Sequence, residues 1–152
     1  MTLFSQILQF LLTGLTIGSI YSMVGLGFNI IYNATTVLNL AQGEFVMFGG
    51  LIMVFFTAVL KFPLFIGFPL TILVVTAIGA LFERFAIHPL RNASLLTLII
   101  ITVAASILFR GIAMFIWGKD PYNLPPFTPG APVMIGGAVI MPQTFWVLGA
   151  AL

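Results

Sequence analysis

Three polar side chains, Asn39, Gln42 and Glu44, stand close together in the stretch LNLAQGEF, between long apolar runs. Glu44 is the only charged side chain among the first sixty residues. One interpretation is structural: Glu44 compensates the positive end of a helix macrodipole, and Asn39 caps that helix. The other is a discontinuous helix at a transport pathway, where Asn39, Gln42, Gly43 and Glu44 lie at or near a gate. The two interpretations are compatible.

Arg110 is the second charged side chain within an apolar run, and it lies seven residues before the end of the run 95–117. A charge inside a membrane costs about 2.5 to 3.5 kcal/mol on insertion scales, so it needs a partner or water. The preferred interpretation is that the long side chain of Arg110 extends to the lipid headgroups. The alternative is a pair with Glu44. Simple alternation of spans keeps the two groups apart, whereas a re-entrant segment before Glu44 lets them meet.

The residue types offer little support for catalysis, metal binding or nucleic-acid binding. The chain has no cysteine and one histidine, which excludes disulfides, thiolate metal sites and histidine clusters. No glycine-rich phosphate loop, metal-ligand spacing or nucleophile-and-base pair is present. We therefore expect no catalytic residue, no metal and no cofactor. Five scattered Lys and Arg residues are also too few for a nucleic-acid surface.

The composition is that of an integral membrane protein, because 61% of the residues are hydrophobic and only 5% are charged. An ordinary soluble domain has about 25% charged residues. Apolar runs cover residues 7–32, 45–60, 64–82 and 95–117. The sequence predicts an all-α polytopic membrane protein with about four complete transmembrane helices, the start of a fifth, and membrane lipid around it.

The second run is short, since its 16 residues make roughly 24 Å of helix against a hydrocarbon core of about 30 Å. Starting the helix at Asn39 or Leu40 would correct the length. Alternatively, residues 33–43 form irregular backbone at membrane depth, which is tolerated only where protein shields it or where it lines a wet cavity. Either way, residues 33–44 are the place for a discontinuous or re-entrant segment.

Small residues recur every four positions in the first run, at Gly14, Gly18 and Ser22. This spacing puts them on one helical face, where a neighbouring backbone can approach closely. Helix packing is the preferred interpretation, and a pathway lining is the alternative.

The segment from Gly118 to Pro142 is predicted to lie outside the membrane, since it contains six of the nine prolines. Gly136 and Gly137 separate two short β-prone runs, which predicts a hairpin with a two-residue turn. A fifth span is expected to begin at Gln143 or Thr144, with nine to ten residues remaining. We therefore expect residues 1–152 to be a single transmembrane domain, incomplete at its carboxyl end. The start of the chain lacks the positive region of a cleaved signal peptide.

The segment 83–94 is expected to be a cytoplasmic loop, because Arg84 and Arg91 flank His88 there. The preferred interpretation is an anchor that sets orientation by the positive-inside rule. The alternative is a docking surface for an acidic partner, stiffened by Pro89. By alternation, Lys61, the proline-rich loop and the amino terminus then face outside.

Several of these segments together resemble one known family. The order GLTIGSIYSMVGLGFNIIY, VLNLAQGEFVMFGG, ERFAIHPLRNAS and a glycine-split hairpin ending in MPQTFW is similar to the amino-terminal half of the branched-chain amino acid ABC permeases of the LivH type. The likeness runs through nearly the whole chain.

This resemblance implies a permease subunit of a binding-protein-dependent importer in the bacterial inner membrane, working by alternating access. Its partners would be a second permease subunit, two cytoplasmic ATPases and a periplasmic or extracellular solute-binding protein. Solutes of such relatives are leucine, isoleucine and valine, other amino acids, amides or urea. The principal ATPase-gripping loop of the family lies in its other half. The rival hypotheses are an ion-coupled secondary transporter or channel, with Glu44 as its ion site, and a nonfunctional truncated permease.

Overall fold

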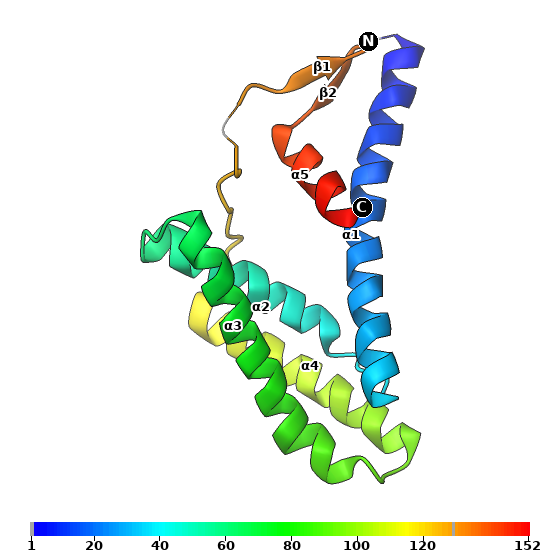
Figure 1. Ribbon diagram of the computed structural model, residues 1–152, viewed down its shortest axis with the longest axis vertical. Coiled ribbons are helices and arrows are strands. Elements are labelled where there is room, and N and C mark those ends of the chain that lie inside the picture. Colours follow the sequence, from blue (N-terminus) through cyan, green and yellow to red (C-terminus); the bar gives the residue numbers. More distant parts are fainter. Residues whose placement is uncertain (1, 129) are drawn as a thin grey trace. The chain divides into compact units, whose positions relative to one another are not determined.

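The computed structural model describes residues 2–128 and 130–152, which are mainly helical (Figure 1). The α-helices and strands in this part of the chain are α1 (Leu3–Thr35), α2 (Gln42–Val54), α3 (Leu64–Phe82), α4 (Leu95–Trp117), β1 (Val133–Ile135), β2 (Ala138–Ile140) and α5 (Pro142–Ala151). A π-helical turn, Phe55–Val59, continues α2. Four helical stretches are long and apolar enough to cross a membrane, namely Leu3–Thr35, Gln42–Val59, Leu64–Leu90 and Leu95–Trp117. The predicted polytopic helical fold with four spans is therefore confirmed.

The described residues form two compact units. One combines the chain up to Gly27 with the chain from Pro125 onward, and it holds most of α1, the hairpin and α5. The other is Phe28–Leu124, and it holds the last two turns of α1 together with α2, α3 and α4.

In the first unit, the predicted β-hairpin is confirmed and lies against α1. Strands β1 and β2 are antiparallel, with Ile135 opposite Ala138. The two-residue turn consists of Gly136 and Gly137, whose φ angles are 57° and 82°. Such angles in successive residues favour glycine, and their twist matches that of the strands.

A side chain of α1 holds the second strand of this hairpin. The Gln9 Oε1 atom accepts a hydrogen bond from the Val139 N–H at 2.7 Å, and Gln9 Nε2 donates to the Val139 carbonyl oxygen at 3.1 Å. The amide of Gln9 thus pairs with backbone groups as a neighbouring strand would. Below the turn, a Cβ atom on Gly137 would lie 3.0 Å from Ser5 Cβ.

Gly137→Ala is expected to loosen this hairpin by about 1 to 2 kcal/mol, because alanine is strained at positive φ. Amide hydrogen exchange of residues 133–140 in the detergent-solubilised protein should then be roughly 5- to 30-fold faster. Gly149→Ala is the matched control, since a Cβ at Gly149 in α5 meets nothing within 4 Å. Unchanged exchange in Gly137→Ala would contradict the constraint.

In the second unit, α2 packs against both α3 and α4, and apolar side chains fill the two interfaces. One buried cluster joins Phe48 and Ile52 of α2 to Ala113 of α4. Aromatic rings extend it, with Phe109 of α4 in edge contact with Phe48 at 5.7 Å between centroids. These contacts fix α2 between its two neighbours.

Helix α3 does not end where the sequence predicted a loop. A π-helical turn, Glu83–Ile87, and a 3₁₀ turn, His88–Leu90, continue it, so the predicted loop 83–94 is wrong over most of its length. The physical reason is that Ile87 is buried in a cluster with Val37 and Leu98, and this apolar burial stabilises the helical extension. Pro89 is tolerated because it lies in the first turn of the 3₁₀ helix, where its missing N–H is not needed.

The other boundaries differ less. Helix α1 extends beyond the expected 7–32 at both ends, and α5 begins at Pro142, directly before the expected Gln143 or Thr144. Helix α4 matches the predicted run 95–117. Its start is fixed by Ser94, whose side-chain oxygen accepts a hydrogen bond from the Thr97 N–H at 3.3 Å.

Candidate functional site

The chain is not helical between α1 and α2. Helix α1 ends at Thr35 and α2 begins at Gln42, and Thr36 between them has a φ of 55°. The predicted irregular segment is therefore confirmed for residues 36–41, whereas a helix start at Asn39 or Leu40 is wrong.

Asn39 does not cap α2, because Ala41 occupies the cap position and no side chain bonds there. The Asn39 Oδ1 atom instead accepts a hydrogen bond from the Ala41 N–H at 3.0 Å, which closes a turn within the irregular segment. The capping hypothesis for Asn39 is wrong, and its side chain stabilises the non-helical backbone.

The irregular segment and the first turn of α2 contact α4 at successive positions. Val37 packs against Leu98, near the start of α4. The Leu38 carbonyl oxygen accepts a hydrogen bond from Thr102 at 3.4 Å, and Glu44 reaches Arg110. The contacts thus move from position 98 to position 110 of α4, roughly 18 Å along the helix axis. Helix α2 therefore begins near the middle of α4 rather than beside its end.

Glu44 is a buried carboxylate that bonds to two donors of α4. Its Oε1 atom accepts a hydrogen bond from Ser106 Oγ at 2.8 Å and an ion-paired hydrogen bond from Arg110 Nε at 2.8 Å. Glu44 is only 5% exposed, whereas the side chain of Arg110 is 66% exposed. Ser106 and Arg110 are four residues apart, which puts both on one face of α4.

Arg110 is ion-paired with Glu44, and extension of its 66% exposed side chain to the lipid headgroups stays a prediction. The ion pair with Glu44 was the alternative, and the interrupted backbone before α2 is what permits it. Sequence reasoning missed Ser106. The available signal was a hydroxyl one helical turn before the only arginine in an apolar run.

A cavity of about 610 Å³ opens on another face of the α2 start, within the second unit. This volume is in the range of small-molecule sites, about 300 to 1,000 Å³. Asn39 and Gln42 line it, and Gln42 is buried. The rest of the wall comes from the end of α1, the first turns of α2, and α3 with its extension, through Ile31, Thr35, Val37, Phe45, Val46, Val75, Thr76, Gly79, Ala80, Phe82, Glu83 and Ile87.

The four residues of the predicted gate therefore divide between two faces. Asn39 and Gln42 line the cavity, and Glu44 turns to α4. Positions 42 and 44 point in nearly opposite directions because a helix turns about 100° per residue. Gly43 between them is exposed, and a Cβ there would meet nothing within 4 Å. The role of these residues as a gate stays a prediction.

The small-residue face of α1 lies in the first unit. A Cβ at Gly14 or Gly18 would meet nothing within 4 Å among the described residues, and Ser22 is exposed. The predicted packing role of this face stays a prediction.

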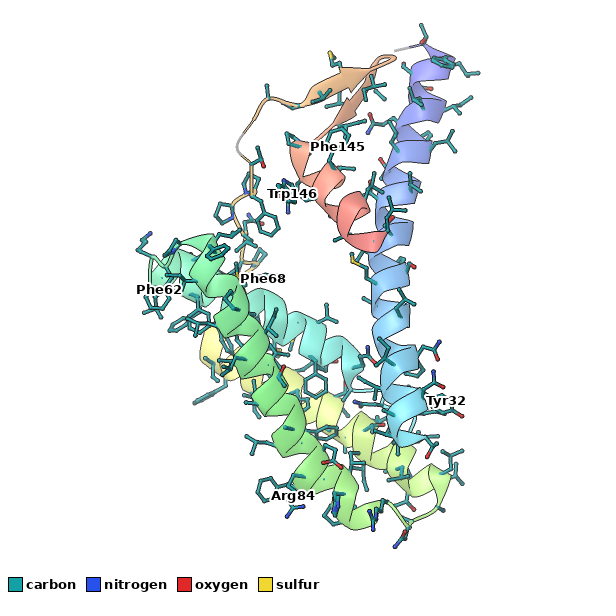
Figure 2. The ribbon with its side chains drawn as sticks, viewed as in Figure 1. Tyr32, Phe62, Phe68, Arg84, Phe145 and Trp146 are labelled. Atoms are coloured by element: carbon teal, nitrogen blue, oxygen red, sulfur yellow. The ribbon has the colours of Figure 1, made fainter. Side chains whose placement is uncertain are left out.

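Three basic residues of the second unit lie just beyond the carboxyl-terminal end of α3. Arg84, His88, Pro89 and Arg91 are all exposed there. Figure 2 shows Arg84 near the end of α3 that is remote from Phe62 and Phe68. The opposite end of α3 is preceded by a single basic residue, Lys61, and the orientation rule counts this difference in Lys and Arg. Whether the basic end binds a partner stays a prediction.

Thiol labelling can test the depth of the irregular segment, because the natural chain has no cysteine. We expect Asn39→Cys in native membranes to react with a small hydrophilic thiol reagent more slowly than Asn92→Cys. Asn39 is half-buried at the cavity, whereas Asn92 is exposed in the turn before α4. Equal rates would mean that residues 36–41 lie in open water.

The comparisons with known proteins agree with one another. Residues 10–152 match the family model described as the permease component of the branched-chain amino acid transport system. The high-affinity branched-chain amino acid transport system permease protein BraD of Pseudomonas aeruginosa is 30% identical over 131 residues, 81% of this chain and 43% of the relative.

The permease proteins LivH of Escherichia coli K12 and of Salmonella typhimurium are each 27% identical over 135 residues, 84% of this chain and 44% of the relative. The chain thus spans less than half the length of these curated relatives. No solved structure gives a significant match.

Proposed function

Because this chain belongs to the branched-chain amino acid transport permease family, we propose that it supplies the amino-terminal part of a permease subunit that carries branched-chain amino acids. It is a multi-pass protein of the bacterial inner membrane. The solute class is the one for which its relatives BraD and LivH are named. The single observation that carries the proposal is the interruption of the helix at 36–41, where two amide side chains line a cavity of about 610 Å³.

This cavity suits a small solute with an aliphatic side chain. Its walls include Val46, Val75 and Ala80, which offer apolar contact to such a chain. Asn39 and Gln42 add two amide groups to this lining, which suit the polar end of an amino acid. Irregular backbone beside a wet passage is also the arrangement that transporters use at membrane depth.

The mechanism that we infer is alternating access driven by partner ATPases. Their closing would reorient packed helices around the passage, and a solute-binding protein would deliver the solute from outside. The partners are thus a second permease subunit, two cytoplasmic ATPases and that binding protein. The exposed basic end of α3, with Arg84, His88 and Arg91, is the surface of this chain that we assign to cytoplasmic docking. The face of Gly14, Gly18 and Ser22 is assigned to packing against another membrane helix.

An ion-coupled mechanism has less support. A proton or cation site needs a carboxylate that is available to the ion, and Glu44 Oε1 is already engaged by Arg110 and Ser106. We therefore assign Glu44 to the positioning of α2.

The proposed function is tested by uptake of labelled leucine into membrane vesicles from cells that express the chain with its genomic partner subunits. We expect uptake that requires the binding protein and ATP and that persists when an ionophore abolishes ion gradients. Vesicles without the chain are the control. Uptake that is independent of ATP and sensitive to the ionophore would instead establish ion coupling.

A further inference from the structure

Arg110 uses only part of its guanidinium group within this chain. A guanidinium carries five N–H donors. Among the residues that the structure describes, Arg110 hydrogen-bonds only through Nε, to Glu44. The terminal nitrogens, with four N–H donors, remain on a side chain that is 66% exposed.

The guanidinium group of Arg110 is held in place by the buried carboxylate of Glu44. Glu44 is 5% exposed, and its Oε1 atom also accepts the hydrogen bond of Ser106 at 2.8 Å. One charge-assisted bond through Nε therefore fixes the side chain of Arg110, while its outer edge stays open. That edge presents two nearly parallel N–H groups, the geometry that binds both oxygens of a carboxylate.

The position of Arg110 along α4 restricts what can lie against it. The residue is seven positions before the end of the helix, roughly 10 Å along its axis. Lipid tails do not accept hydrogen bonds, so open guanidinium donors at this position require water, a lipid headgroup, a polar protein group or a solute. Lysine would not serve equally, because it offers a point charge without the planar fork.

We propose that Arg110 is a binding site for the carboxylate of the transported amino acid, and that Glu44 and Ser106 are its positioning residues. This inference rests on the proposed function. The site lies on the α4 side of the α2 start, whereas the cavity lies on the face of Asn39 and Gln42. Gly43 and Glu44 then lie between two binding positions for the solute, the cavity and the Arg110 guanidinium, as residues of a gate would.

The experiment is arginine modification by phenylglyoxal in native membranes that contain the chain with its partner subunits, read by peptide mass spectrometry at Arg110. We expect leucine to slow the modification about ten-fold at about ten times its dissociation constant, because only unoccupied sites react. Isovalerate, which keeps the branched chain and the carboxylate, should also protect. Isopentylamine, which lacks the carboxylate, should not protect. Vesicles without added ligand give the reference rate of Arg110 modification.

Two results would overturn the proposal. One is an Arg110 that does not react under any condition, which would mean that protein or lipid covers its guanidinium. The other is equal protection by isopentylamine and isovalerate, or by none of the ligands. Leucine uptake measured on the same vesicles separates this failure from a failure of the proposed function, because uptake can continue without protection at Arg110.

A second variant tests whether Glu44 positions Arg110. Glu44→Gln keeps the shape of the side chain but removes the charge that holds Arg110. We expect faster modification of Arg110 and weaker protection by isovalerate, with the chain still present in membranes. Lys119→Gln removes a positive charge just beyond α4 and serves as the matched control. Protection that is unchanged in Glu44→Gln would overturn the positioning role.

Discussion

Glu44→Ala is expected to lower leucine uptake at least ten-fold while the amount of protein in the membrane falls much less. The substitution leaves Arg110 without its counter-charge within the span and removes the acceptor of Ser106. The start of α2 then loses its polar attachment to α4. Loss of such a pair costs on the order of 1 to 3 kcal/mol, and each 1.4 kcal/mol is a factor of ten in an equilibrium constant.

The measurement is ATP-driven uptake in vesicles, normalised to membrane yield by immunoblot. Asp120→Ala is the matched control, since Asp120 is an exposed carboxylate in the loop after α4. Arg110→Ala and the double variant complete the cycle. We expect the double variant to lose less than the sum of the single losses, because neither charge is then left alone. Equal loss of uptake and yield in Glu44→Ala would leave only a structural role for the carboxylate.

Gly79→Leu is expected to block uptake by ten-fold or more, whereas Gly79→Ala should retain it. Gly79 lies in the wall of the large cavity, and its nearest neighbour to an added Cβ is Phe45 Cε1 at 3.9 Å. Alanine therefore fits in ordinary contact and also favours the helix by up to about 1 kcal/mol. The further carbons of leucine occupy space that we assign to the solute.

The pair of variants separates obstruction from misfolding. Both add apolar atoms at the same helical position, so both should reach the membrane in similar amounts. Uptake is measured as initial rate, with membrane yield measured by immunoblot. If Gly79→Leu transports at the rate of Gly79→Ala, the solute does not use the cavity, and the proposed pathway is wrong.

The helices and the hairpin were predictable because their signals are local. The runs 64–82 and 95–117 are mainly apolar; the second matches α4 at both ends, and the first matches the start of α3. Gly136 and Gly137 predict their own turn, since few other residues adopt successive positive φ angles. The resemblance to the permease family also rests on linear motifs, and the comparisons bear it out.

The predictions that failed depend on contacts between distant parts of the chain. The extension of α3 to Leu90 follows from burial of Ile87 against Val37 and Leu98, which no local charge count reveals. The pairing of Glu44 with Arg110 spans 66 positions and requires the depth at which α2 begins. Sequence reasoning named that depth as one alternative, but only the packing of residues 36–41 against α3 and α4 selects it.

The two hydrogen bonds between Gln9 and Val139 have a consequence for the synthesis of the protein. Its two partners are 130 positions apart, and the ribosome adds about 5 to 20 residues per second, so Gln9 emerges roughly 7 to 26 s before Val139. During that interval the amide of Gln9 must rely on water or on the insertion machinery for its hydrogen bonds. Chains released from the ribosome before Val139 would therefore carry the first helix without these two hydrogen bonds.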